Sequence, residues 1–520
     1  MTSFYADAGD RAALAAVAVD VFCVDTDTRG DAAGTKKTSG YLASVAPLAS
    51  RSGGALFRYG AAGWDDEASA PPVPRDAFRA LASERCVRER EVSMDDARAG
   101  ETSGDALHCT LRVRTSAEFV VSAARGGGIV PDETYEGLFH VPRCSSLDGF
   151  AFDLEHARSR GFGRGGDCPP TAQMAFEFTR IETLFESDPE EKTRETNDGA
   201  AARVIGITRR RVRRVCTRQA AVASTPDDVV MSADAEATFG VVYRKILDAA
   251  EEDGVAEARE LLADWLAALA AKRARESRDS RHVDIEGRNA SERVDASFAN
   301  APALRRVAKW THAALARSAA LAVPGFAASC LESHRDFFSA DARVAAFWTH
   351  RRLGPSALAR TVYPEITAWT ADGGSLETRS IDAANADEDD ARRATPTVIP
   401  ASREALIQSG GYLFVADAHD TVVAFQAPAQ PGSPAALAAF PPPRASPARA
   451  FVEGARRRRA PAPSVSYVRG GADSPAPFDR VLVEEMDVAL LPGGQTIFGG
   501  LEGFRRATEA RARAMLQGEV

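Results

Sequence analysis

The stretch that decides the fold runs from residue 395 to residue 427 and reads TPTVIPASREALIQSGGYLFVADAHDTVVAFQA. The stretch begins with prolines, and a short segment with the pattern of a helical turn follows them. A Gly-Gly turn then precedes two apolar runs, Tyr412–Ala416 and Thr421–Phe425. Because the polar residues Asp417–Asp420 separate these runs, the pattern predicts a β-hairpin that follows a short helix. The stretch contains no nucleophile beside a base and no phosphate-binding loop. It therefore indicates a fold and does not indicate a catalytic activity.

The bulk composition predicts a multidomain protein with ordinary cores. The chain has 520 residues, a hydrophobic content of 45% and a net charge of −9, which favours three or four domains and argues against general nucleic-acid binding. Seven scattered Cys form no CxxC pair, so neither a disulfide framework nor a zinc ribbon is indicated. No signal-peptide core and no run of eighteen apolar residues occur. These features predict a cytoplasmic protein.

The first hundred residues predict a fragment of an α/β domain. An apolar run at 17–24 is typical of a strand buried on both faces of a parallel sheet. A helical segment at 41–49, a second strand at 55–59 and a helix at 76–90 follow. A doubly wound sheet needs more strands than these, so we expect that the chain begins inside a domain.

The next hundred residues have the period of β-strands. Apolar and polar residues alternate in four segments with turn-rich joints between them, which predicts an antiparallel β-sandwich. The segments are 111–124, 147–155, 172–182 and 202–215.

Beyond Pro226 the period becomes helical. Phe239, Tyr243 and Leu247 recur at intervals of four residues, and further helices are predicted near 303–322 and 340–352. After the hairpin, residues 427–463 are rich in Pro and Ala and predict a linker around one short helix. The C-terminal residues predict a strand at Arg480–Glu484 and a helix at 501–516.

Several local strings follow one another along the chain: SGGALF (52–57), CTLRVRTS (109–116), AQMAFEFTR (172–180), a helical pair at 233–269 and RTVYPEITAW (360–369). In this order they resemble strings of the inner-coat subunits of the COPII vesicle coat, and the resemblance runs collinearly over about residues 15–510. The helical pair and the tail are more similar to the GTPase-activating subunit than to its cargo-adaptor paralogue.

The resemblance implies a multidomain α+β fold. Its four parts would be the C-terminal part of a von Willebrand A-like α/β trunk (1–104), an antiparallel β-sandwich (105–226), an all-α helical domain (227–352) and a gelsolin-like domain with a C-terminal tail (353–520). A disordered insert is expected at 272–300. The sequence has no counterpart of the family's four-cysteine zinc finger, so no zinc or other cofactor is implied.

The family's GTPase-activating subunit places an arginine of its gelsolin-like domain in the nucleotide site of a small Arf-family GTPase. The segment SYVRGGADSPAPFDRVLVEE (466–485) resembles the one with that role, and the match makes Arg480 the candidate arginine finger, acting in trans. A guanidinium neutralises charge on the transferred phosphoryl group. The alternative is an ordinary surface arginine that pairs with Asp479 or Glu484.

Two basic clusters depart from the acidic average. The first crowds one predicted strand, where membrane contact is predicted because the family's concave face is basic. It consists of Arg209, Arg210, Arg211, Arg213 and Arg214. The second is the run Arg456–Arg459 in the predicted linker, which is more typical of a solvated segment.

The resemblance implies a coat protein of endoplasmic-reticulum-to-Golgi transport, peripheral on the endoplasmic reticulum membrane and on COPII vesicles. Its implied partners are a small Arf-family GTPase, the paralogous coat subunit, outer coat subunits and an anionic membrane surface, without nucleic acid. Alternatives are the cargo adaptor and a gelsolin-type actin-binding protein. An enzyme in its own right is disfavoured, because no nucleophile–base pair or metal-binding motif occurs.

Overall fold

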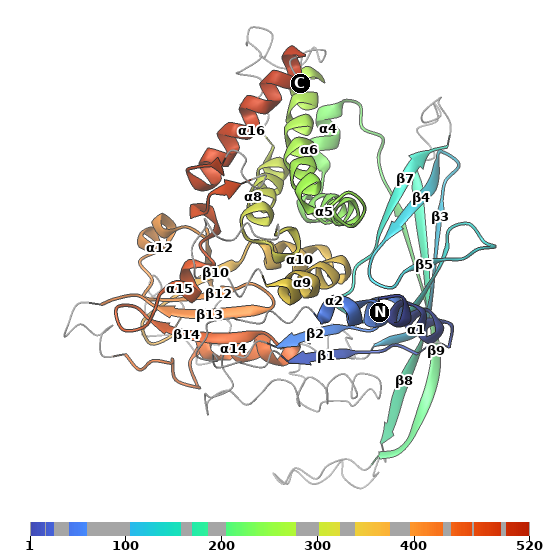
Figure 1. The fold of residues 1–520 in the computed structure, drawn as a ribbon, viewed down its shortest axis with the longest axis horizontal. Helices are drawn as coiled ribbons and strands as arrows, with labels where there is room; N and C mark the ends of the chain where they lie inside the picture. The colour runs from blue at the N-terminus through green and yellow to red at the C-terminus, as the bar shows by residue number, and fades with distance from the viewer. Residues whose placement is uncertain are drawn as a thin grey trace, which may run out of the picture. The chain divides into compact units, whose positions relative to one another are not determined.

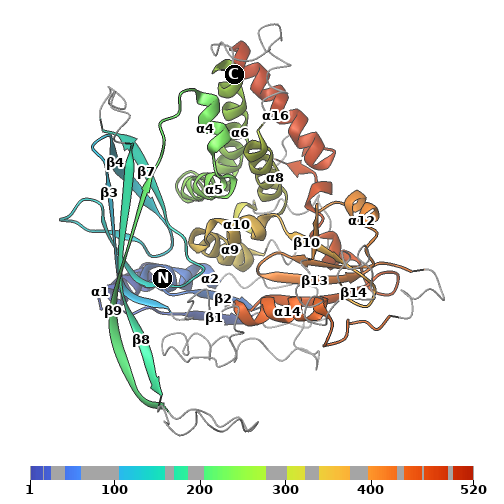
Figure 2. The same cartoon turned by 180° about the vertical axis from the view of Figure 1, so that it is seen from behind.

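The structure is a computed structural model (Figures 1 and 2), and the chain divides into two compact units. Unit 1 comprises Met1–Lys37 and Tyr41–Val222, and unit 2 comprises Thr38–Gly40 and Ala223–Val520. The structure describes residues 2–15, 17–24, 41–59, 105–157, 169–185, 204–276, 301–322, 339–374, 396–429, 438–459, 462–489 and 496–518.

Unit 1 opens with a small α/β segment. It contains α1 (Thr2–Leu14), β1 (Val21–Val24), α2 (Leu42–Ser52) and β2 (Leu56–Tyr59). The two strands pair in parallel, and the rings of Phe22 and Phe57 stack with centroids 4.5 Å apart. The predicted strand–helix–strand order is therefore confirmed, whereas α1 was not predicted. The helix predicted at 76–90 lies outside the described residues.

The rest of unit 1 is an antiparallel β-sandwich, as predicted. A five-stranded sheet has the order β5-β6-β3-β8-β9, and β4 and β7 form a second sheet. The strands are β3 (Ala106–Thr115), β4 (Phe119–Arg125), β5 (Val130–Pro131), β6 (Leu138–Cys144), β7 (Ala151–His156), β8 (Thr171–Phe185) and β9 (Val204–Gln219).

Side chains of both sheets fill the interior of the sandwich. Leu111, Val113 and Phe139 of the larger sheet are buried against Phe150 and Phe152. The segment 111–124, predicted from its alternation to be of β type, contains parts of two strands, because a turn separates β3 from β4. In that turn the N–H of Phe119 donates to the carbonyl of Ser116 at 3.1 Å.

The first part of unit 2 is helical. It contains α4 (Pro226–Ser232), α5 (Ala235–Glu252), α6 (Val255–Glu276), α8 (Pro302–Arg317), η3 (Ala319–Leu321), α9 (Ala340–Arg352) and α10 (Pro355–Val362). The predicted helical period is confirmed, since Phe239, Tyr243 and Leu247 are all fully buried.

Two boundaries in this part differ from the expectations. Helix α6 continues to Glu276, so the first residues of the expected disordered insert 272–300 are helical, and residues 277–300 lie outside the described part. Helix α10 packs against α5 and α8, which moves the end of the helical part beyond residue 352. Near the C-terminus, α16 (Gly500–Gln517) confirms the predicted helix and packs against α6 rather than on the sheet.

A five-stranded sheet of order β11-β10-β12-β13-β14 forms the second part of unit 2. Its strands are β10 (Glu365–Trp369), β11 (Thr397–Ile399), β12 (Leu413–Asp417), β13 (Thr421–Gln426) and β14 (Ser464–Arg469), and α12 (Arg403–Ser409) precedes β12. The antiparallel β12–β13 pair confirms the predicted hairpin after a short helix. Strand β14 joins β13 in parallel.

Both faces of this sheet are covered, which explains why β12 is buried along its whole length. Leu413 and Val415 face α14 (Pro447–Arg458), which lies along β13 and β14 in Figure 2. Helix α14 confirms the one short helix predicted within residues 427–463, but it is not part of a linker, because Ala448, Val452 and Ala455 belong to the core.

Phe414 and Ala416 face the opposite side of the sheet, where the segment that contains Arg480 packs. That segment forms α15 (Ala476–Asp479) and the 3-10 turn η7 (Val483–Glu485), and a short pair, β15 (Val488–Ala489) with β16 (Thr496–Ile497), follows it. The strand predicted at Arg480–Glu484 is therefore wrong. Its apolar run is buried by a tight turn against the sheet, and a sequence pattern does not distinguish such a turn from a short strand.

Candidate functional sites

Arg480 lies between two buried anchors. On its N-terminal side Phe478 is 1% exposed and stacks on Phe425 of β13, with ring centroids 4.3 Å apart. On its C-terminal side Val481 and Leu482 are buried in the same core. The backbone of Arg480 is therefore held from both sides, and its side chain emerges half-buried at the end of α15.

The two acids expected to pair with Arg480 have other partners. Arg403 Nη2 lies 2.8 Å from Asp479 Oδ1. Glu484 Oε1 accepts from Lys309 Nζ at 2.9 Å and from the Tyr363 hydroxyl at 2.6 Å. Within the described part of the chain, neither an ion pair nor a hydrogen bond is formed by the Arg480 side chain, and its buried Nε has no acceptor. The alternative of an ordinary paired surface arginine is thus not what the structure shows.

Backbone contacts fasten this segment to the residues before α12. The N–H of Glu484 donates to the carbonyl of Ala401 at 3.1 Å, and the N–H of Arg403 donates to Glu485 Oε1 at 2.8 Å. The N–H of Ala401 in turn donates to the Tyr363 hydroxyl at 3.1 Å. These bonds hold the segment around Arg480 against a second segment from elsewhere in the sequence.

The protonation states in this network are fixed by burial. Burial and the adjacent Glu484 carboxylate raise the pKa of Tyr363 well above its ordinary value, so its hydroxyl remains a donor. Burial lowers the pKa of His312 to about 4, although its hydrogen bond to Met486 opposes the shift. His312 is therefore neutral at pH 7, and its Nε2–H donates to the carbonyl of Met486 at 2.9 Å.

The second candidate site is β9, the end strand of the larger sheet of unit 1. All five arginines predicted for membrane contact lie on this strand and are exposed. Successive side chains of a strand point to opposite faces of a sheet. One face therefore carries Arg209, Arg211 and Arg213, and the other carries Arg210 and Arg214.

The first of these faces is partly neutralised by Glu177 of β8. Arg211 Nε lies 2.9 Å from Glu177 Oε1, and Arg213 Nε lies 2.7 Å from Oε2. The hydrogen bonds from Arg211 and Arg213 hold the pKa of Glu177 below its ordinary value. Arg211 also reaches across β8 to the carbonyl of His108 at 2.7 Å. This arginine therefore has a structural role that the sequence did not reveal.

The second basic cluster is only partly described. Arg459 binds both carboxylate oxygens of Asp417 at 2.6 Å, and Asp417 is almost completely buried. Arg456 pairs with Glu453 one turn earlier on α14. Neither residue is part of a solvated, flexible run, so that expectation was wrong for Arg456 and Arg459.

The described residues include no group of three His, Cys, Asp or Glu side chains that could hold a metal ion. Among the helices that the structure describes, none has both the length and the apolar character needed to cross a bilayer.

Comparisons with known proteins find similarity both by sequence and by structure. No family model matches the chain. It is 28% identical to protein transport protein SEC23 D of Arabidopsis thaliana over 489 residues, which cover 94% of this chain and 55% of that protein. The crystal structure of the human COPII-coat protein Sec24c matches 98% of the chain and 55% of its own length, with a TM-score of 0.61 and 12% identity. The chain thus spans about half the length of each relative.

Proposed function

Because the chain belongs to the family of COPII inner-coat subunits, we propose that it is a coat component that stimulates GTP hydrolysis by a small Arf-family GTPase. In this proposal residues 1–104 correspond to the end of a von Willebrand A-like trunk, and the sheet of unit 2 corresponds to the gelsolin-like domain. Its partners are the GTPase, the paralogous coat subunit and outer coat subunits, at the cytoplasmic surface of the endoplasmic reticulum. The chain supplies one catalytic group to its partner and is not an enzyme by itself.

The observation that carries this proposal is the unpaired side chain of Arg480 on an anchored backbone. An arginine that stabilises a transferred phosphoryl group must offer its N–H donors to a partner and must keep its position while doing so. Asp479 and Glu484, the two acids nearest in sequence, are bound by Arg403, Lys309 and Tyr363. They therefore do not compete for the guanidinium.

The test is single-turnover GTP hydrolysis by a purified Arf-family GTPase with the full chain added. Arginine fingers contribute roughly 10³–10⁵ in rate, so Arg480→Ala should abolish most of the stimulation while leaving binding of the GTP-bound GTPase largely intact. Arg480→Lys should also fail, because an ammonium lacks the planar fork of donors. Arg506→Ala on α16, where the arginine is exposed and pairs with Glu502, is the matched control.

Stimulation by Arg480→Ala equal to that of the wild type would refute the arginine finger. The cargo-adaptor alternative, which does not need Arg480, would then be the better assignment.

We also propose that the exposed arginines of β9 contact an anionic membrane surface. Each basic residue near such a surface contributes about 1 kcal/mol, so Arg209→Gln with Arg210→Gln should weaken binding to phosphatidylserine vesicles by roughly 30-fold. The control pair Arg505→Gln with Arg506→Gln changes the net charge equally. Flotation that is insensitive to salt, or that both pairs weaken equally, would contradict membrane contact through β9.

A further inference from the structure

Strand β9 has a free edge. It pairs with β8 from Thr171–Gln219 to Phe185–Val204, and on its other side the sheet ends among the described residues. An end strand presents a row of backbone donors and acceptors to which another extended chain can pair. Lysines and arginines on such a strand discourage self-association, and they select an acidic partner.

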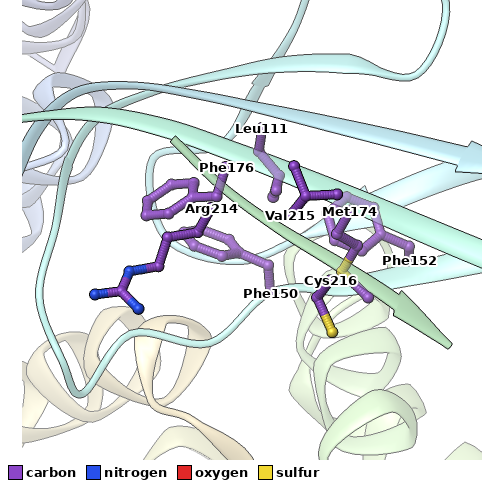
Figure 3. Close-up of a pocket in the computed structure, with 8 residues that line it drawn as sticks. All are labelled: Leu111, Phe150, Phe152, Met174, Phe176, Arg214, Val215 and Cys216. Atoms are coloured by element: carbon purple, nitrogen blue, oxygen red, sulfur yellow. The ribbon is translucent and has the colours of Figure 1, made fainter. Parts of the chain in front are cut away.

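An apolar pocket opens beside this edge, on the inner face of the sandwich (Figure 3). Its volume is about 350 Å³. It is lined by Leu111, Phe150, Phe152, Met174, Phe176, Arg214, Val215 and Cys216. Four strands or their flanks therefore contribute to one cavity.

The pocket continues the hydrophobic core outward. Leu111, Phe150, Phe152 and Phe176 pack in the interior of the sandwich. Met174, which pairs with Cys216, is nevertheless 38% exposed. Apolar surface that continues a core to the solvent is a site where an incoming apolar side chain gains burial.

Two uncompensated charges flank the pocket. Arg214 and Cys216 line the pocket, and Arg218 lies on the same face of β9 as they do, because successive side chains of a strand alternate between its two faces. Within the described residues no carboxylate pairs with Arg214 or Arg218, whereas Arg211 and Arg213 on the opposite face share Glu177. The pocket face therefore lacks the acid that the opposite face already has.

We propose that the edge of β9 binds an acidic, extended segment of a partner protein as an additional strand. Directly opposed residues of paired strands have neighbouring side chains. The residue opposite Cys216 would place an apolar side chain at the pocket, and the residues two positions before and after it would meet Arg218 and Arg214. The recognised pattern is acidic–x–apolar–x–acidic, in which backbone pairing supplies affinity and the pocket supplies specificity. This inference does not depend on Arg480.

The test measures binding of a fluorescent, end-blocked nine-residue peptide to the full chain. Its third and seventh residues are glutamate, its fifth is leucine, and the others are threonine. We expect Arg214→Gln with Arg218→Gln to weaken binding at least tenfold, and serine in place of the leucine to do the same. The matched control, Arg209→Gln with Arg213→Gln, neutralises two charges on the opposite face of the same strand and should change binding less than twofold.

Amide hydrogen exchange of residues 212–219 identifies the mode of binding. Pairing of the peptide as a strand should slow exchange of alternate amides there at least tenfold. Unchanged thermal unfolding of the variants shows that they are folded.

The proposal would be overturned in favour of general charge attraction if the two double arginine variants lost peptide binding equally. Amide exchange that the peptide does not slow would overturn it in the same way. Absence of peptide binding, together with vesicle binding that requires Arg214 and Arg218, would overturn it in favour of a lipid surface.

Discussion

The carboxylate of Asp479 is bound by Arg403, which lies 76 residues earlier in the chain, and not by its neighbour Arg480. The pair is solvent-exposed, and exposed ion pairs contribute about 0–1 kcal/mol to stability. Its proposed effect is therefore on the availability of the Arg480 guanidinium rather than on folding.

The first prediction concerns this pair. Arg403→Ala releases Asp479, whose carboxylate can then compete for Arg480, so we expect stimulation of GTP hydrolysis to fall about tenfold, which corresponds to about 1.4 kcal/mol. The double variant Arg403→Ala with Asp479→Ala should restore most of the stimulation, because the competing acid is gone. A double variant no faster than the single one would show that Arg403 does not act through Asp479.

The second prediction concerns Tyr363. Tyr363→Phe removes the hydroxyl that donates to Glu484 and accepts from the buried N–H of Ala401. A buried donor left without a partner costs about 1–3 kcal/mol, and urea unfolding of unit 2 should shift accordingly. Tyr412→Phe, at a more exposed tyrosine, is the control and should change stability by less than about 0.5 kcal/mol. Equal effects of the two substitutions would contradict the assigned role.

The third prediction concerns pH. Burial lowers the pKa values of His312 and His419 to about 4 and that of His350 to about 3. The folded state therefore resists protonation that the unfolded state accepts, and stability falls as the pH drops from 6.5 towards 4. Each histidine contributes up to about 1.4 kcal/mol per pH unit in this window.

His312→Gln should accordingly reduce the slope of stability against pH by up to about 1.4 kcal/mol per pH unit in this window. The stability at each pH is measured by tryptophan fluorescence during urea unfolding. This signal reports on unit 2, because Trp265, Trp310, Trp348 and Trp369 all belong to it. Between pH 6.5 and 8 the variant and the wild type should have the same slope, because these histidines are neutral in both states. A slope unchanged below pH 6.5 would mean that His312 is protonated in the folded protein.

The fourth prediction concerns Arg143 in unit 1. Its guanidinium lies between Asp20, at 2.7 Å, and Asp105, and is 7% exposed. Burial alone would lower the pKa of Arg143, but the carboxylates of Asp105 and Asp20 outweigh it and raise this pKa above its ordinary value. Arg143→Ala leaves two acids close together without a cation, and we expect a loss of about 3–5 kcal/mol. Arg51→Ala, in the exposed pair with Asp10, should cost less than about 1 kcal/mol. Calorimetry of both variants compares the two cases.

The elements that are specified by local sequence patterns were predicted correctly. The hairpin at β12 and β13, the parallel pair β1 and β2, and the helical period through Phe239 and Tyr243 are all confirmed. The helices were indicated by an apolar period that matches the helix, and the strands by short apolar runs bounded by turn residues.

The predictions that were wrong or missing have a different cause. The apolar run Val481–Val483 is buried by a turn rather than by a strand. The short helix within the Pro- and Ala-rich stretch was predicted, but its place in the core was not, because Ala448 and Ala455 form much of its core face. The acids near Arg480 are bound by Arg403, Lys309 and Tyr363, each far from it in sequence. No local pattern reports such a contact.

The double anchoring of Arg480 has a consequence for the entropy of association. Ordering the backbone of one residue costs about 1–2 kcal/mol, and the residues from Phe478 to Leu482 are ordered by the core before any partner arrives. A GTPase that docks here would restrict little more than the Arg480 side chain, at up to about 2 kcal/mol. A flexible loop carrying the same arginine would lose several times more freedom on binding, so the rigidity of this turn would appear as a longer lifetime of the complex.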